Sequence, residues 1–225
     1  MSTVLVIGAS RGIGFELARQ YLAAGDRVIA TVRDDAAQAN LKALGAEVLK
    51  VDVAKSESVS GLAWQLDGEK IDVALNVAGV VDRADARTPP TQRDFDRLMH
   101  TNVLGAMQVI PQMAPMVEAA KGGLGKFVFI SSAMGQIKGV ASSYSWTYRV
   151  SKAALNMAVA SAQNDYPRAI MVAMSPGWVK TDMGGAGATL TVRQSAASMR
   201  GAIAGLTAKH KGQFLNYDGL DMGAW

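Results

Sequence analysis

The chain of 225 residues contains no cysteine, only two histidines and no long hydrophobic run. Without cysteine, neither disulfides nor thiolate metal sites can form. His100 has no metal-ligand partner at helical spacing, and His210 lies between two lysines in a turn that we expect to be exposed. No segment approaches the roughly 20 apolar residues that a membrane-spanning helix needs. We therefore expect neither a metal site nor a membrane span.

The N-terminus lacks the basic flank of a signal peptide, and its apolar run is too short for one. Basic residues exceed acidic ones by 23 − 19 = 4, without the runs or stripes that indicate nucleic-acid binding. The excess could reflect an anionic ligand or scattered surface lysines. We expect a cytoplasmic protein with no nucleic-acid partner.

Short apolar runs alternate with helical stretches along the whole chain, and no linker or repeat interrupts them. The length suits one domain spanning residues 1–225. The alternation predicts an α/β fold, a doubly wound Rossmann-type parallel sheet of about seven strands with helices on both faces. Strands are expected at residues 3–7, 27–32, 47–51, 71–76, 126–130, 169–173 and 213–215, with helical stretches that include residues 95–120 and 145–164.

A glycine-rich turn, Gly8-Ala9-Ser10-Arg11-Gly12-Ile13-Gly14, follows the first expected strand. Gly8 permits a tight turn, Gly12 lets the backbone approach a pyrophosphate, and Gly14 lets the next helix pack closely on the strand. The N-terminus of that helix offers N–H groups and a positive dipole end to phosphates. A turn without a ligand is the alternative, but the strand before it and the helix after it favour a nucleotide site.

Tyr148 and Lys152 are four positions apart and would share one face of a helix. A tyrosine titrates near pH ~10 and is a poor acid–base catalyst at neutral pH. A cation about 5 Å away favours the phenolate by about 3 kcal/mol at an effective dielectric near 20. The pair therefore predicts a tyrosine pKa lowered toward the range useful for general acid catalysis. Taken alone, such a pair is more often a half-exposed aromatic residue beside a solvated lysine.

Together, the Gly-x-x-x-Gly-x-Gly turn and the Tyr-x-x-x-Lys pair resemble the short-chain dehydrogenase/reductase family. Asn76-Val77-Ala78-Gly79 closes the fourth expected strand, where the family carries Asn-Asn-Ala-Gly, and we expect Val77 to be tolerated. Other family positions follow in order along the whole chain: Asn102, Ser131-Ser132, Pro176-Gly177 and Thr181.

The fifteen residues between Ser132 and Tyr148 are slightly more than the family usually has. This spacing, the string Tyr-Arg-x-Ser-Lys-x-Ala-Leu-Asn and the ending at residues 216–219 resemble the branch of C-factor-like and sniffer-like carbonyl reductases. Some members of that branch are linked to signalling or stress protection rather than to a fixed metabolic step.

The resemblance implies an oxidoreductase that transfers hydride between nicotinamide C4 and a carbonyl or alcohol carbon. Tyr148 would be the general acid or base, while Lys152 would lower its pKa and hold the nicotinamide ribose. Ser132 would hydrogen-bond the substrate oxygen; Ser131 is the rival, but Ser132 fits the family's Ser-x-x-Gly. Asn102 would position a water that links Lys152 to solvent.

The residues after the second expected strand bear on the choice of cofactor. NAD enzymes commonly place an acid there, whereas NADP enzymes place arginine near the 2′-phosphate. Val32 stands in the position of the acid, Arg33 follows it, and Arg11 can approach the same phosphate. We therefore predict NADP(H). The alternative is that Arg33 is a surface residue; Asp34 and Asp35 are expected to face solvent.

By resemblance, Asp52 contacts the adenine, although it could simply cap the next turn, and Thr181 with the backbone near Val179 binds the carboxamide. The residues expected to bind the cofactor are Gly8, Ser10, Arg11, Gly12, Ile13, Gly14, Arg33, Asp52, Val53, Asn76, Ala78, Gly79, Tyr148, Lys152, Pro176, Gly177, Val179 and Thr181.

A short, glycine-rich and therefore mobile lid is expected at residues 177–191. Several large side chains flank the expected site, and if they face inward, the pocket suits small ketones, aldehydes or quinones. Taken singly, each is more often part of the core. They are Met134, Tyr144, Trp146, Trp178 and Met183.

The expected helix at residues 145–164 is rich in alanine. In the family this helix and the one that carries Asn102 often pair across a dimer axis, although the alanines could instead pack on the protein's own sheet. We expect a homodimer, with a tetramer as the alternative. Three functions stay open: an NADP-dependent carbonyl reductase acting on a small molecule, a cofactor-binding signalling protein of the C-factor type, and a dedicated 3-oxoacyl-carrier reductase.

Overall fold

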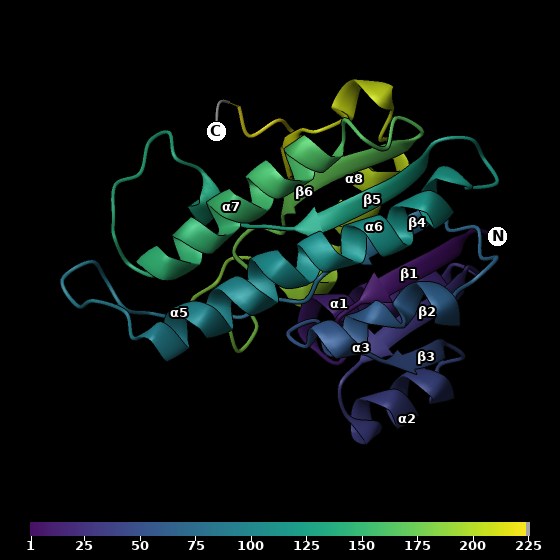
Figure 1. Cartoon of the computed structure of the whole chain (residues 1–225), viewed down its shortest axis with the longest axis horizontal. Coiled ribbons are helices and arrows are strands. Elements are labelled where there is room, and N and C mark those ends of the chain that lie inside the picture. Colours follow the sequence, from purple (N-terminus) through teal and green to yellow (C-terminus); the bar gives the residue numbers. More distant parts are fainter. Residues whose placement is uncertain (224–225) are drawn as a thin grey trace.

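The computed structural model describes residues 1–223 of the chain (Figure 1). Within them the strands are β1 (Thr3–Ile7), β2 (Arg27–Val32), β3 (Glu47–Lys50), β4 (Val73–Asn76), β5 (Gly125–Ile130), β6 (Ala169–Ser175) and β7 (Phe214–Asn216). They form one parallel sheet in the order β3-β2-β1-β4-β5-β6-β7. The strand order reverses beside β1, so the sheet is doubly wound as predicted.

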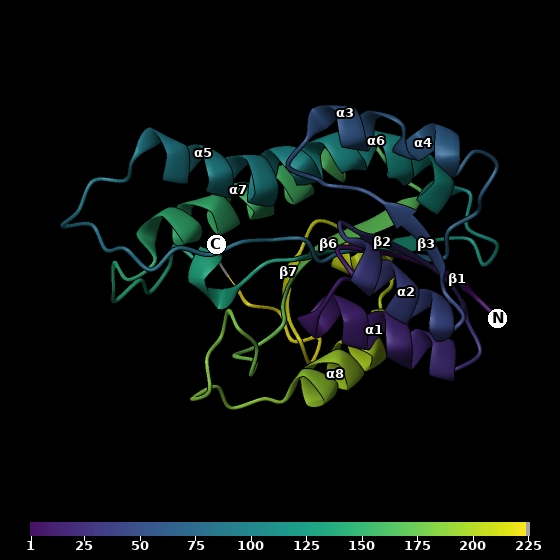
Figure 2. The ribbon, with the colours of Figure 1, turned by 90° about the horizontal axis from the view of Figure 1, so that it is seen from below.

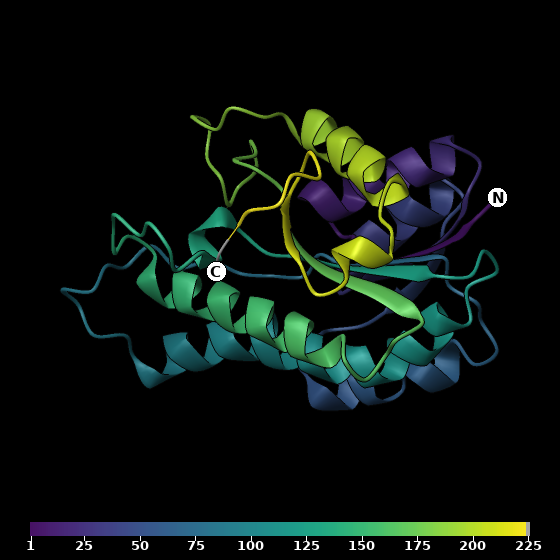
Figure 3. The same cartoon turned by 90° about the horizontal axis from the view of Figure 1, so that it is seen from above.

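Helices cover both faces of this sheet. They are α1 (Gly12–Ala23), α2 (Asp35–Ala43), α3 (Ser56–Ser60), α4 (Leu62–Gln65), α5 (Gln92–Met99), α6 (Gly105–Glu118), α7 (Trp146–Ala162) and α8 (Val192–Ala204), with a π-helical turn η1 (His100–Leu104) and 3₁₀ turns η2 (Ala133–Gly135) and η3 (Ala208–His210). Figures 2 and 3 show α1, α2 and α8 on one face and the other α-helices on the opposite face.

Each face of the sheet has its own hydrophobic core, because alternate side chains of a strand point to opposite faces. On β1, Val4 and Val6 belong to the core that faces α1, α2 and α8, whereas Leu5 and Ile7 belong to the core that faces α3, α4, α6 and α7. All four side chains are fully buried. Burial on both faces is why the strands read as continuous apolar runs in the sequence.

The predicted strands and helices are present, with differences at their ends. β4 begins at Val73 rather than at residue 71, because the N–H of Ile71 bonds to the carbonyl of Met116 in α6. The single helix expected at residues 95–120 is instead α5 and α6 separated by η1, which carries Asn102. Over residues 1–223, no helix is both long and apolar enough to cross a membrane.

The carboxyl ends of the parallel strands lie along one edge of the sheet, where ligands bind in folds of this kind. The glycine turn follows β1, Asn76 ends β4, Ser131 and Ser132 follow β5, and Pro176 follows β6. The topology therefore brings the predicted motifs to one edge.

Candidate active site

The glycine turn is shaped by close backbone approaches. Gly8 has φ of +88°, and a Cβ there would lie 2.8 Å from the backbone nitrogen of Ala78; a Cβ on Gly14 would lie 2.2 Å from the carbonyl oxygen of Gly8. Gly12 also has a positive φ, of +56°. The N-cap residue of α1, Arg11, makes no side-chain hydrogen bond to the first turn. The backbone of this turn and the uncapped helix end fit a phosphate group.

A groove of about 500 Å³ runs along the strand edge from the end of β2 to α7. Apart from three residues, every position that the sequence predicts as cofactor-binding lines this groove. Gly177 and Val179 line a neighbouring cavity instead. Asn76 is buried, and its Oδ1 accepts no hydrogen bond from the described residues. The lining of this groove includes both the glycine turn, which suits a phosphate group, and the ammonium of Lys152. A dinucleotide fits such a groove, because its pyrophosphate and one of its riboses can contact these two places.

The phosphate end of the groove carries two arginines. Arg33 is exposed and takes part in none of the ion pairs formed within residues 1–223. Arg11, in contrast, pairs with Asp182 at 2.6 Å between Nη1 and Oδ2. Asp34 caps α2 and Asp35 pairs with Lys50, so neither occupies the place of an NAD-selecting acid.

Asp52 lines the same end of the groove and also accepts a hydrogen bond within the turn that follows β3. Its Oδ1 accepts a hydrogen bond from the N–H of Ala54 at 3.1 Å. The two interpretations of Asp52 from the sequence, a cofactor contact and a turn cap, are therefore compatible with one another. Val53 lines the groove beside it.

Tyr148 and Lys152 occupy adjacent turns of α7, and both are buried. The Nζ of Lys152 lies 5.7 Å from the centroid of the Tyr148 ring and donates a hydrogen bond of 2.8 Å to the carbonyl of Ile130. The predicted pairing on one helix face is therefore present, and β5 supplies the contact that orients the ammonium.

The predicted lowering of the tyrosine pKa is wrong for this structure. Burial raises the pKa of Tyr148 to about 12, and the hydrogen bond with Ser132 opposes this only in part. Burial also lowers the pKa of Lys152 to about 8. The estimate from helix spacing counted the attraction between the two groups and omitted the desolvation of both, which is the larger effect.

Asn102 is tied to the segment after β4 and to α7. Its Nδ2 donates to the carbonyl of Val80 and to the hydroxyl of Ser151, each at 2.9 Å, while its Oδ1 accepts from the N–H of Val80 at 2.8 Å. The Ser151 hydroxyl in turn donates to the carbonyl of Tyr148. Both amide hydrogens of Asn102 are thus used within the protein, and π-helical turns of this kind are frequent at functional sites.

The two serines after β5 have different surroundings. Ser131 is buried, and its Oγ donates to Oδ1 of Asn156 at 2.5 Å. The Ser132 Oγ accepts from the N–H of Met134 at 3.1 Å, and Ser132 lines the cavity beside Tyr148. Ser132, and not Ser131, is therefore the serine whose hydroxyl faces the cavity beside Tyr148.

Asp82 supports the start of α7, a role that the sequence analysis did not predict. Ser145 precedes the helix in a left-handed conformation (φ 56°) and donates its hydroxyl to the carbonyl of Asp82 instead of capping the helix. The carboxylate of Asp82 accepts from the N–H of Tyr148 at 3.2 Å, which is the cap contact. No local pattern could reveal this, because 66 residues separate the partners.

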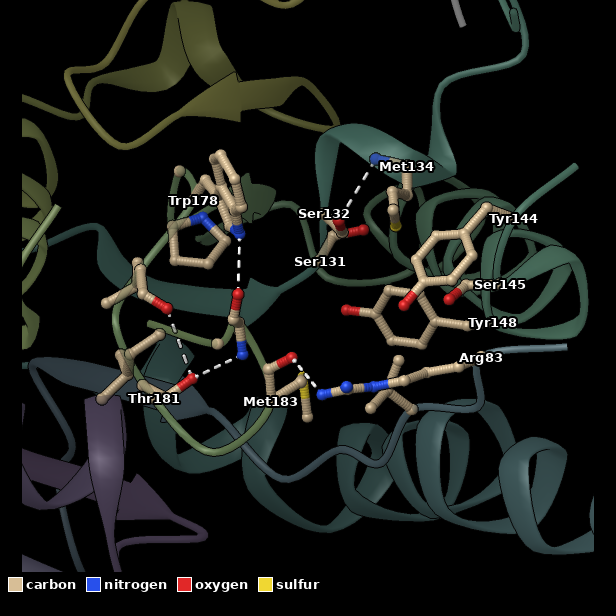
Figure 4. A pocket seen from close by; sticks show the side chains of 17 residues that line it. Arg83, Ser131, Ser132, Met134, Tyr144, Ser145, Tyr148, Trp178, Thr181 and Met183 are labelled. Atoms are coloured by element: carbon tan, nitrogen blue, oxygen red, sulfur yellow. Dashed lines mark hydrogen bonds between the residues drawn. The ribbon is translucent and has the colours of Figure 1, made fainter. Parts of the chain in front are cut away.

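A second cavity, of about 320 Å³, adjoins the groove at Tyr148 (Figure 4). Four of the five large side chains predicted to flank the site line it, namely Met134, Tyr144, Trp178 and Met183, whereas Trp146 does not. Arg83, which the sequence interpretation missed, extends along this cavity toward Met183.

The expected lid at residues 177–191 is folded back on itself. The N–H of Lys180 donates to the carbonyl of Leu190, and the N–H of Leu190 donates to the carbonyl of Trp178. The indole N–H of Trp178 donates to the carbonyl of Gly184 at 2.8 Å. These bonds close the segment into a wall of the second cavity (Figure 4).

Comparison with known proteins agrees with this geometry. Residues 2–189 match the short chain dehydrogenase family. The C-signal of Myxococcus xanthus is 37% identical over 154 residues, covering 68% of this chain and 92% of that protein. Carbonyl reductase Sniffer of D. melanogaster has a TM-score of 0.92 at 28% identity, with both chains covered in full. A short-chain dehydrogenase/reductase from Burkholderia multivorans with bound NADP has a TM-score of 0.87 at 29% identity, covering 100% of this chain and 99% of that one.

Proposed function

The chain belongs to the short chain dehydrogenase family, and we propose that it is an NADP(H)-dependent oxidoreductase that reduces the carbonyl group of a small molecule. The observation that carries this proposal is the position of Tyr148 where the groove and the second cavity meet. Lys152 lines only the groove and Ser132 lines only the cavity, so a proton donor stands between a cofactor site and a substrate site.

In this proposal, the bound nicotinamide supplies the hydride. The glycine turn and the N-terminus of α1 hold the pyrophosphate, and Arg33 holds the 2′-phosphate, with Arg11 joining it on release from Asp182. Lys152 binds the nicotinamide ribose, while Val179 and Thr181 bind the carboxamide. NADP in the similar Burkholderia multivorans structure supports this choice of cofactor.

Tyr148 acts as the general acid. Its pKa of about 12 keeps the phenol protonated at neutral pH, and an alkoxide is a far stronger base than the phenolate because its conjugate acid is about as weak an acid as water. Ser132 donates its hydroxyl to the substrate oxygen and stabilises the developing charge.

The test combines cofactor binding with turnover. We expect NADPH to quench the fluorescence of the four tryptophans at lower concentration than NADH, and Arg33→Ala to weaken NADPH binding by about tenfold. Tyr148→Phe should still bind NADPH but lose about 10³-fold in kcat for carbonyl reduction. Equal binding of the two cofactors would refute the role of Arg33, and failure to bind either would refute the proposed enzyme.

The likeness to C-signal favours a signalling role as the second candidate. Tyr148→Phe separates the two functions, since it removes proton donation while leaving the groove in place. A cellular phenotype that survives loss of turnover would favour cofactor binding as the basis of a signal. A phenotype lost together with turnover would favour the enzyme.

We also propose a homodimer. Apolar side chains are exposed on the outer surface of η1, α6 and α7, namely Leu104, Met107, Val150 and Met157. Such surfaces mark contacts between proteins. The wild type should sediment as a dimer, and Met157→Glu, at a side chain that is 65% exposed, should shift it toward monomer. A wild type that sediments as a monomer would contradict this proposal.

A further inference from the structure

The second cavity, in which the proposed function places the substrate, has one charged side chain among the described residues that line it, that of Arg83. The rest of the lining consists of apolar, aromatic, hydroxyl-bearing and glycine residues. Arg83 does not line the groove, so it is not placed to bind a cofactor phosphate. Arg83 is exposed to solvent at this cavity, so its guanidinium is accessible to a ligand that enters.

Two carboxylates in the same loop as Arg83, and that of the lid residue whose carbonyl it contacts, are already engaged with other groups. Asp82 accepts from the N–H of Tyr148, Asp85 pairs with Arg87, and Asp182 pairs with Arg11. None of the ion pairs within residues 1–223 includes Arg83. The charge of Arg83 is therefore not balanced by a carboxylate in direct contact.

The hydrogen bonds that Arg83 makes are long. Its Nη2 donates to the carbonyls of Asp182 and Met183, both at 3.4 Å, at the far end of the range for such bonds. Neutral carbonyls at this distance are easily exchanged for a charged acceptor, which binds a guanidinium at shorter distance and about twice as strongly. Figure 4 shows the side chain stretched along the cavity wall, with the guanidinium between Tyr148 and Met183.

We infer that the substrate carries a carboxylate that pairs with Arg83 while its carbonyl group lies at Tyr148 and Ser132. This inference rests on the proposed function. The planar guanidinium suits a carboxylate because two parallel N–H groups can bind its two oxygens. Asp82, the residue before Arg83, is bonded to the N–H of Tyr148, so the backbone from which the Arg83 side chain extends is anchored beside the proton donor.

The test uses two aldehydes of nearly the same shape, 4-carboxybenzaldehyde and its methyl ester, methyl 4-formylbenzoate. With NADPH, the wild type should show a kcat/KM about tenfold higher for the acid, mainly through KM. Arg83→Gln should bring the acid-to-ester ratio close to one. Arg87→Gln, in the same loop but lining neither cavity, is the matched control and should keep the wild-type ratio.

If Arg83 serves only to support the lid, Arg83→Gln will lower turnover of both aldehydes and leave their ratio unchanged, which would overturn the inference. Binding of the two aldehydes, measured by tryptophan fluorescence, distinguishes a failure of the inference about Arg83 from a failure of the proposed reductase activity. Suppose that neither aldehyde is reduced, but that the acid binds wild type about tenfold more tightly than the ester and Arg83→Gln removes this difference. The proposed activity is then wrong, and the inference that Arg83 binds a carboxylate, the anion site, is retained. Equal binding of acid and ester, or no binding of the acid, would refute the anion site.

Discussion

The catalytic end of the groove and its phosphate end are held in different ways. At the catalytic end, Tyr148, Lys152 and Asn102 are buried, and hydrogen bonds join them to the backbone of β5, α7 and the segment after β4. At the phosphate end, Arg11 and Asp182 are paired but their side chains are 74% and 81% exposed. In the proposed function, proton transfer is thus placed among buried, hydrogen-bonded groups, and recognition of the cofactor phosphates among exposed side chains for which solvent competes.

The largest effect should come from crowding the glycine turn. In Gly14→Ala the new Cβ would lie 2.2 Å from the carbonyl oxygen of Gly8, so the α1–β1 contact must open. We expect a loss of about 3 kcal/mol in the free energy of unfolding, measured by urea denaturation, and loss of NADPH binding. Gly201→Ala in α8 is the control, because nothing lies within 4 Å of its Cβ. A Gly14→Ala protein as stable as wild type would contradict the role of the close approach.

The buried lysine at the catalytic end should make stability depend on pH. The pKa of Lys152 is about 8 in the folded protein and 10.5 when unperturbed, so between these values the unfolded chain binds more protons and the free energy of unfolding rises with pH. Over the two units from pH 8 to pH 10, the wild type should gain about 2 kcal/mol relative to Lys152→Met, which lacks this group. About two units below pH 8 and lower, the lysine is protonated in both states and its contribution is constant.

Urea denaturation of both proteins at pH 7, 8, 9 and 10 measures this difference. The comparison should stop at pH 10, because the raised pKa of Tyr148, about 12 against the usual 10, acts in the opposite direction above that pH. Stabilities of wild type and Lys152→Met that run parallel over the whole range would show that the Lys152 ammonium is not desolvated in the folded protein.

A smaller effect should follow from the distant cap of α7. Asp82→Ala removes the acceptor for the N–H of Tyr148, which should cost about 1 kcal/mol of stability and lower kcat by about tenfold through displacement of the tyrosine. Asp82→Asn retains an oxygen in the same place and should recover most of kcat. Asp85→Ala, which removes the partner of Arg87 in the same loop, controls for loop disorder. Equal kcat values for Asp82→Ala and wild type would remove Asp82 from the positioning of Tyr148.

The same contrast explains what the sequence could predict. Gly14 is required by a contact within one strand–turn–helix unit, because a Cβ there would meet the carbonyl oxygen of Gly8, so local spacing can predict this close approach; the close approach of Gly8 to Ala78 comes from a different part of the chain. Helix spacing likewise predicts that Lys152 lies near Tyr148, at 5.7 Å from the ring centroid. Spacing contains no information on burial, and the prediction for the pKa of Tyr148 was therefore wrong. Arg83 lies in a loop whose course is set by contacts with α7 and the lid, far away in the sequence.

The smallest effect is expected at the exposed ion pair between Arg11 and Asp182. Asp182→Asn removes the partner of Arg11 and one negative charge from the phosphate end, so NADPH should bind about twofold to threefold more tightly while NADH changes less. Asp35→Asn is the control, since Asp35 pairs with Lys50 at a similar exposure outside the lining of the groove. Fluorescence titration of both cofactors measures the change. Weaker NADPH binding by Asp182→Asn would mean that the Arg11–Asp182 pair holds the lid in its binding position. The phosphate end of the groove would then depend on a fixed contact, as the catalytic end does.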